Sequence, residues 1–283
     1  MKPQVALLVI VFWFNVQNAM SQNLPLAKSI DTAHQSVVAI IRVNSEGKSF
    51  VTGSGVLIRP NVVLTAGHVN FSVIKLWDSI AAPKGFVSFG NNVNASHERI
   101  PFNWLKNVVT HPDQAEVWKS YSDTTGKSSP TKFIDIGLIF LDRPVLDIPL
   151  VHLPDSQMLS AINKNDHLVG VGYGYDKEDS IYQRIPELID GLRRKWELSQ
   201  FSLVNDLWLK TGCDLATNLP FMGMFDSGAP LLLNDNLVVG IWVSSDKAPK
   251  PCLFSSLAVR IDNPRVLKWI HDQINVRLDT KSK

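Results

Sequence analysis

A single serine, Ser227, stands in a short polar turn between two apolar stretches, PFMGMFDSGAPLLL. A lone serine hydroxyl is a poor nucleophile, so serine-based acyl transfer needs a neighbouring base and a group that orients the base. His68 ends the run NVVLTAGHV, which predicts an imidazole at the end of a buried strand. Asp135 begins the run DIGLIFL, where an ionised carboxylate is costly unless it is hydrogen-bonded. These groups can act as one unit: Asp135 fixes the tautomer of His68, which accepts the Ser227 proton as Ser227 attacks a carbonyl carbon.

Short apolar runs between Gly, Asn, Pro and Asp predict the strands that must position these groups. The runs are SVVAIIRV, GVLIRPNVVLTAG, GFVSFG, FIDIGLIFL, HLVGVGYG, FSLVNDLWL, APLLL, LVVGIWVSS and SLAVRI. Many strands at short intervals are typical of an all-β sandwich or a pair of barrels, and not of a βαβ succession. Residues 234–236, Asn-Asp-Asn, predict a turn and are residue types that tolerate positive φ.

A clear helix is predicted only near the C-terminus. Asn263 is suited to cap this helix and Pro264 to its first position. The residues that recur on its apolar face are Val266, Leu267, Ile270 and Ile274. We expect this face to pack back onto the strands.

Residues 1–21 have the features of a secretory signal peptide: a positive Lys2, the apolar run VALLVIVFWF and a small-residue cleavage site. We therefore expect a secreted or periplasmic protein, free of the membrane once the signal is removed. The rest of the chain is predicted to divide into residues 22–150 and 151–283, because the segment between strands there is rich in Pro, Asp and Asn.

The charge balance excludes partners that are recognised by strong charge. The formal net charge is +2, or 2 − 1 = +1 without Lys2, which indicates neither a nucleic-acid nor a membrane-surface partner. The basic cluster 193–195 is predicted to be a solvated face of a strand or loop. The segment 176–195 is polar enough to form a long surface loop.

Cysteine and histidine spacing limits the crosslinks and metal sites. Cys213 and Cys252 predict one disulfide, and two buried free thiols are the alternative. A disulfide closing this loop is worth roughly 4 kcal/mol in chain-entropy models. No metal or cofactor is expected, because no metal-ligand spacing occurs among the histidines His34, His97, His152, His167 and His271.

Two further motifs have a local interpretation. The sequence His111-Pro112-Asp113 is predicted to be a loop, since no helical hairpin surrounds it. Asn70 and Asn94 begin N-glycosylation sequons, which matter only in a source that glycosylates.

The segments LTAGHV, DIGLIFL and FDSGAP, in the chain order His, Asp, Ser, resemble the three catalytic segments of the chymotrypsin-like, or trypsin-fold, serine proteases. The resemblance covers nearly the whole mature chain. It includes the segments GSGVLIRPNVVLTAGHV, VVTHPD, IPLVHLP, VGVGYG, LVVGIWVSS and VLKWIHDQI. It implies two six-stranded antiparallel β-barrels packed together, with a C-terminal α-helix. It also implies a serine endopeptidase of protein or peptide substrates that uses no cofactor, and we expect a monomer.

The sequence departs from the family at the oxyanion hole, which the resemblance assigns to the N–H groups of Phe225 and Ser227. Phe225 stands where the family normally has glycine. If Phe225 takes a positive φ, the backbone strain costs about 1–2 kcal/mol. If the peptide instead flips away, losing one donor costs about 3–4 kcal/mol in the transition state.

The resemblance leaves activation open. In members activated by cleavage, a new N-terminal ammonium pairs with the carboxylate at the position of Asp226. No IVGG-like start is present, and the group in its place is expected to be Leu24, Ile30 or an internal cation.

The resemblance assigns the substrate pocket to Phe221, Val243, Ser244 and Ser245. An apolar base favours uncharged side chains over Lys and Arg. Cys252 matches a pocket-framing cysteine whose usual partner is missing, so its pairing is expected to be rearranged.

The disulfide that braces the histidine loop in the family is also absent here. Val69 follows His68, and the loop must be held by packing alone.

Two other function classes compete with an active protease. A catalytically impaired homologue that binds or regulates would account for Phe225 and the unmatched activation site. A lipase or esterase on another fold is disfavoured, because FDSGA lacks the first Gly of the nucleophile elbow and the chain order differs.

Overall fold

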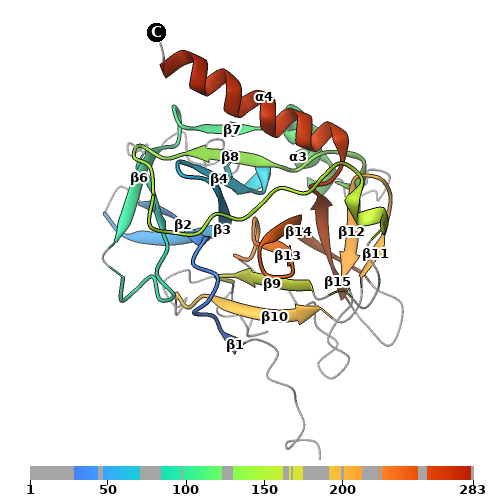
Figure 1. The fold of residues 1–283 in the computed structure, drawn as a ribbon, viewed down its shortest axis with the longest axis horizontal. Helices are drawn as coiled ribbons and strands as arrows, with labels where there is room; N and C mark the ends of the chain where they lie inside the picture. Colours follow the sequence, from blue (N-terminus) through green and yellow to red (C-terminus); the bar gives the residue numbers. More distant parts are fainter. Residues whose placement is uncertain are drawn as a thin grey trace, which may run out of the picture.

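The computed structural model describes most of the chain from residue 29 onward. The described residues are 29–43, 47–70, 84–96, 98–122, 130–161, 166, 168–174, 191–198, 201–211, 223, 225–247 and 254–281. Several sequence predictions fall outside these ranges: those for the signal peptide 1–21, Leu24, His97, His167, residues 176–190, Cys213, Phe221 and Cys252. Within the described residues, two curled antiparallel sheets and a long C-terminal helix dominate the fold (Figure 1).

The first sheet has the strand order β6-β5-β2-β3-β4-β8-β7. Its strands are β2 (Val37–Val43), β3 (Ser49–Arg59), β4 (Val62–Thr65), β5 (Lys84–Ser88), β6 (Arg99–Asn103), β7 (Val108–Thr110) and β8 (Gly137–Phe140). β4 pairs with β8 so that Thr65 lies opposite Gly137. This register places the residues that follow β4 beside those that precede β8, and these are the segments of His68 and Asp135.

The second sheet has the strand order β1-β10-β9-β13-β14-β15-β12-β11. Its strands are β1 (Ser29–Ile30), β9 (Leu168–Gly172), β10 (Arg194–Leu198), β11 (Phe201–Leu203), β12 (Trp208–Thr211), β13 (Pro230–Leu233), β14 (Leu237–Lys247) and β15 (Phe254–Arg260). The turn between β13 and β14 has φ values of 49° at Asn234 and 66° at Asp235. The predicted turn is therefore confirmed, and two of its residues adopt the positive φ that they tolerate.

The apolar runs of the sequence account for most of these strands. All nine predicted runs contribute to strands, which confirms the all-β prediction. The described residues form seven- and eight-stranded sheets, not six strands each, because very short strands such as β1 and β7 extend the edges. β6 has the sequence RIPFN and lies at a sheet edge, where its proline is tolerated.

Helix α4 (Pro264–Lys281) follows the prediction closely. Asn263 Oδ1 accepts a hydrogen bond of 2.9 Å from the Arg265 N–H, which is the expected cap. Pro264 is the first helical residue. The residues of the predicted apolar face are all buried, namely Val266, Leu267, Ile270 and Ile274. In Figure 1, α4 lies along the first sheet, over β7 and β8.

The structure also contains helical segments that the sequence does not signal clearly. Helix α3 (Gln114–Ser122) follows β7, residues 67–70 are helical, and the 3₁₀ helices η1 (Pro130–Lys132) and η2 (Met158–Ala161) lie in connections. α3 has the sequence QAEVWKSYS, in which Val117 is fully buried. The apolar period of this short helix is too weak to be read from the sequence.

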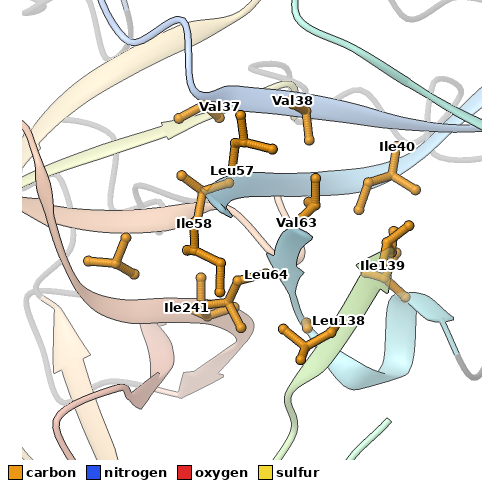
Figure 2. Close-up of a cluster of buried hydrophobic side chains, with 14 of the residues drawn as sticks. Val37, Val38, Ile40, Leu57, Ile58, Val63, Leu64, Leu138, Ile139 and Ile241 are labelled. Atoms are coloured by element: carbon orange, nitrogen blue, oxygen red, sulfur yellow. The ribbon is translucent and has the colours of Figure 1, made fainter. Parts of the chain in front are cut away.

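The hydrophobic core joins the two sheets. One buried cluster contains Leu57 and Leu64 of the first sheet together with Ile241 and Val259 of the second. Figure 2 shows Ile241 of β14 together with Leu64 of β4 among the side chains of this cluster. The two sheets therefore share buried apolar surface, and their relative position is fixed by packing.

A buried network of charged groups ties the N-terminal segment to the second sheet. Arg193 Nε lies 2.8 Å from Asp31 Oδ2, and His34 Nδ1 lies 2.7 Å from Asp31 Oδ1. The Asp31 N–H donates to the Arg193 carbonyl at 2.8 Å. The prediction of a solvated basic cluster was wrong at Arg193, which is 1% exposed because Asp31 neutralises it. Most of the predicted surface loop, residues 176–190, lies outside the described residues; in its described end, Leu192 pairs with Asn92 and β10 begins at residue 194.

The same network shifts the titration of its members. Burial opposes ionisation of Asp31, but the hydrogen bonds and charges of His34 and Arg193 together lower its pKa to about 2. The hydrogen bond to Asp31 raises the pKa of His34 against the opposing effect of burial. Burial raises the pKa of Tyr173 to about 12, and its hydroxyl donates to the Gly90 carbonyl at 2.7 Å.

Candidate active site

His68 and Asp135 meet through two hydrogen bonds. The His68 N–H lies 2.7 Å from Asp135 Oδ1, and His68 Nδ1 lies 2.9 Å from Asp135 Oδ2. The carboxylate is fully buried, whereas the His68 side chain is 18% exposed. Because an ionised carboxylate can only accept, Nδ1 carries the proton and Nε2 of the neutral ring keeps its lone pair. This is the tautomer that a general base needs.

Ser227 lies in the serine turn, which we define as residues 225–228, immediately before β13. The Gly228 N–H donates to the Trp242 carbonyl at 2.8 Å, so the turn is anchored to β14. The Ser54 N–H donates to the Ser227 carbonyl at 2.8 Å, which anchors the turn to β3 of the other sheet. Gly228 has a φ of 86°, and a Cβ there would strike the Ser54 carbonyl and the Thr65 hydroxyl. Only glycine fits this contact between the sheets.

The serine turn and the histidine segment are neighbours. A Cβ atom at Gly53 would come within 2.8 Å of the Ser227 carbonyl oxygen and within 2.9 Å of Val69 Cγ2. Ser227 and the residue that follows His68 therefore face the same point of β3. Ser227 is partly exposed, so its side chain can be reached from solvent.

Phe225 has a φ of 69°, in the left-handed region. This corresponds to the first of the two alternatives above, a strained backbone that costs about 1–2 kcal/mol. The Phe225 side chain is partly buried against the large core cluster. The Ser54 hydroxyl donates to the Phe225 carbonyl at 3.1 Å and accepts the Tyr173 N–H at 3.0 Å. Contacts from both sheets thus hold the strained residue.

Two backbone donors of the serine turn are uncommitted. Among the described residues, neither the Phe225 N–H nor the Ser227 N–H donates a hydrogen bond. A pair of uncommitted amides two residues apart, one of them on a serine, can receive the negative oxygen that forms when that serine attacks a carbonyl.

Asp226 is fully buried and accepts hydrogen bonds from backbone amides. The Gly174 N–H lies 2.7 Å from its Oδ1, and the Gly223 N–H lies 2.9 Å from its Oδ2. Ile30 was one of the groups predicted to pair with this carboxylate. It lies in β1, where it pairs with Arg194 of β10, and it is 58% exposed. These two backbone amides stabilise the buried carboxylate.

The histidine loop packs against the core, as its lack of a bracing disulfide requires. Val69 is 3% exposed and belongs to the large buried cluster. Its methyl groups occupy the space beside Gly53, which is where a larger residue on β3 would otherwise reach.

The residues predicted to form the substrate pocket have mixed environments. Val243 is 3% exposed and Ser244 is partly exposed. A bulge between Trp242 and Ser244 interrupts the pairing of β14 with β15, which re-aims the side chains at this point. Ser245 belongs to β14, and the assignment of all these residues to a pocket stays a prediction.

Two buried polar residues at the site escaped sequence reasoning. Ser54 holds the serine turn, and the sequence signal for it is a serine between two glycines in a strand. Gln114 lies against Asp135: with its amide nitrogen turned to the carboxylate, Nε2 is 2.9 Å from Asp135 Oδ1. The signal for Gln114 is its place next to the turn 111–113, which the family resemblance puts before the acid loop.

The remaining motifs of the sequence supply none of the candidate catalytic groups. Within the described residues, no group of three or more His, Cys, Asp or Glu side chains could hold a metal ion. The His111-Pro112-Asp113 sequence forms the turn between β7 and α3. Asn70 is fully buried, whereas Asn94 is exposed.

Comparison with known proteins agrees with this geometry. The trypsin family model matches residues 29–270 of the chain. No curated protein matches it at a significant level.

Two solved structures illustrate the fold. GrC aligns with 15% identity and a TM-score of 0.57, over 88% of this chain and 98% of its own. Neuropsin, a serine protease expressed in the limbic system of mouse brain, aligns with 15% identity and a TM-score of 0.58, over 86% of this chain and 95% of its own. The predicted fold class is confirmed.

Proposed function

Because the chain belongs to the trypsin family, we propose that it is an active, exported serine endopeptidase in which Ser227 is the nucleophile. The observation that carries the proposal is the buried Asp135 carboxylate, which holds His68 in the tautomer of a general base. The serine turn, docked on the adjoining strand, supports the same role for Ser227.

Acylation follows from these groups. His68 Nε2 accepts the proton of the Ser227 hydroxyl while Oγ forms a bond to the carbonyl carbon of the substrate peptide. The carbonyl electrons move onto its oxygen, which the N–H groups of Phe225 and Ser227 stabilise. His68 then gives its proton to the leaving amine nitrogen as the C–N bond breaks. Asp135 stays ionised throughout and stabilises the imidazolium.

Deacylation repeats these steps with water. His68 takes a proton from water, the hydroxide adds to the acyl carbon, and the new oxyanion occupies the same two amides. Collapse of this intermediate returns the proton to Ser227 Oγ and releases a carboxylic acid. No cofactor takes part in the proposed cycle.

The decisive test compares the purified mature protein with Ser227→Ala on casein and on an activated ester. We expect hydrolysis by the parent protein and a loss of at least 10³-fold in the variant, the scale on which triad members act. A fluorophosphonate probe should label the native parent protein and neither the denatured protein nor Ser227→Ala. Equal hydrolysis by the two proteins would reject the proposal.

A second function, that of a non-catalytic binding homologue, is favoured by one observation. Phe225 occupies a strained conformation that glycine would adopt freely. The backbone strain at Phe225 costs about 1–2 kcal/mol, whereas the loss of an oxyanion donor would cost about 3–4 kcal/mol. Because the smaller cost applies, an active enzyme is the better interpretation. A native protein that binds peptides but reacts with no fluorophosphonate would favour the homologue.

For substrates, we propose protein or peptide chains with an uncharged residue before the cleaved bond. The assignment of Phe221 and Val243 to the pocket underlies this proposal, because an apolar base penalises a buried Lys or Arg. A peptide-library profile dominated by Arg or Lys would contradict it.

Export is proposed from the sequence of residues 1–21. In the described part of the chain, no helix has the length and apolar character needed to span a bilayer. Sequencing of the N-terminus of protein collected from the medium or periplasm tests cleavage near Gln22 and any later clipping.

A further inference from the structure

Gln114 makes polar contacts with both members of the His68–Asp135 pair. With the amide nitrogen turned toward the carboxylate, its side-chain Nε2 lies 2.9 Å from Asp135 Oδ1, and its Oε1 lies 3.2 Å from the His68 backbone nitrogen. Only this orientation of the amide lets each of its ends meet a group of the opposite kind. Gln114 is 2% exposed, so water does not compete for either contact.

The Asp135 carboxylate depends on few donors. Asp135 is fully buried, and an ionised carboxylate at such a position is costly unless donors surround it. His68 supplies two of its donors, the backbone N–H and Nδ1–H. Among the described residues, Gln114 is the only other residue that donates to it. The Gln114 bond is therefore the one restraint on this carboxylate that does not come from the histidine itself.

The turn before α3 is fastened on both sides of Asp135, so Gln114 is held rigidly. The His111 N–H donates to the Ile136 carbonyl at 2.9 Å, and the Ile134 N–H donates to Asp113 Oδ2 at 3.0 Å. The Gln114 N–H in turn donates to the His111 carbonyl at 3.0 Å. These bonds grip the residues immediately before and after the carboxylate.

The absence of a side chain at Gly67 leaves space for the Gln114 side-chain amide. A Cβ at Gly67 would strike the Gln114 side-chain amide and come within 3.0 Å of Asp135 Oδ1. The glycine before His68 therefore leaves room for Gln114 and not for bulk solvent.

We infer that Gln114 is a positioning residue, which holds the Asp135 carboxylate in the orientation that fixes the tautomer and direction of His68. The inference deepens the proposed function and rests on it for the catalytic effect. Helix α3 begins at Gln114, so the helix positions the residue that restrains the Asp135 carboxylate.

The test replaces Gln114 with Met, which keeps the length and approximate volume of the side chain and removes the donor. Because a hydrogen bond to a charged group is lost, we expect kcat to fall about 10- to 100-fold with KM little changed. Gln114→Glu keeps the shape of the side chain but places an acid beside Asp135, so its kcat should fall at least as far. Val117→Ala is the matched control, since it empties a buried site on the same helix without touching the carboxylate. It should lower the melting temperature and leave kcat unchanged.

A spectroscopic readout separates this inference from the proposed function. The proton of His68 Nδ1, hydrogen-bonded to Asp135, should give a low-field NMR resonance in the parent protein and in Val117→Ala. In Gln114→Met that resonance should shift and exchange faster with water. If no Ser227-dependent hydrolysis exists but the resonance responds in this way, the proposed function fails and the positioning role stands. An unchanged resonance together with an unchanged kcat in Gln114→Met would overturn the inference.

Discussion

The strain at Phe225 can be measured by replacing the residue with Gly and with Ala. Both changes remove the partly buried ring and its packing, which costs about 1 kcal/mol for a half-buried Phe. Ala keeps a Cβ and therefore keeps the strain of a φ of 69°. Gly relieves that strain, so the two variants differ in the strain and in the entropy of the unfolded chain.

The expected difference follows from these two quantities. Relief of the left-handed conformation stabilises the folded protein by about 1–2 kcal/mol. The greater conformational freedom of glycine in the unfolded chain lowers the stability by about 0.5–1 kcal/mol. Phe225→Gly should thus be more stable than Phe225→Ala by about 0.5–1 kcal/mol, and close to the parent protein. In hydrolysis, Phe225→Gly should keep the full rate, because glycine holds the same φ without cost.

The assay is urea unfolding of each variant in a Ser227→Ala background, which prevents self-digestion. Phe201 of β11 provides the matched control, since it is partly buried and does not have a positive φ. There the order should reverse, with Gly less stable than Ala by about 0.5–1 kcal/mol. Phe225→Gly at or below the stability of Phe225→Ala would refute the strained conformation and the argument built on it.

Three further predictions concern the surroundings of the site. Ser54→Ala removes the hydroxyl that bonds the Phe225 carbonyl, so kcat should fall about 10-fold with KM unchanged, measured by steady-state ester hydrolysis; a pure KM effect would contradict it. The pKa of Asp31 is lowered to about 2, so its contribution of about 2 kcal/mol to the free energy of unfolding is present above pH 4 and lost as the pH falls toward 2. The pKa of His34 is raised, so its contribution to the free energy of unfolding is complete below pH 6.5 and lost as the pH rises above that value. Urea unfolding from pH 2 to 8 should show both declines, and the acid-side decline should be smaller in Asp31→Asn. In a glycosylating host, peptide mass spectrometry should find a glycan at the exposed Asn94 and none at the buried Asn70; a glycan on Asn70 in folded protein would contradict the burial.

The sequence predicted elements whose signal is local. Strands such as β8 are continuous apolar runs, and α4 carries a cap, a first-turn proline and an apolar face within 12 residues of sequence, 263–274. His68, Asp135 and Ser227 were predicted to act as one unit because each adjoins such a run, and because the family resemblance gives their order.

What the sequence could not predict depends on contacts between distant residues. Arg193 is buried because Asp31, 162 positions away, neutralises it, and no local pattern encodes that pairing. Gln114 is the first residue of helix α3, whose sequence is mostly polar and carries only a weak apolar pattern. The φ of Phe225 is likewise set by surroundings, since a bulky residue has no intrinsic preference for positive φ.

These long-range contacts make the serine turn a product of the docked sheets. Ser54 of β3 donates to the carbonyls of Phe225 and Ser227, and its hydroxyl also receives the N–H of Tyr173, which follows β9. The second sheet alone would lack the Ser54 hydrogen bonds that hold Phe225 at positive φ, and the left-handed residue would relax to regain about 1–2 kcal/mol. The Phe225 and Ser227 N–H groups would then change their relative orientation. The proposed oxyanion site therefore requires the first sheet to be packed in place, so a variant that loosens the sheet interface should lose hydrolysis before it loses its secondary structure.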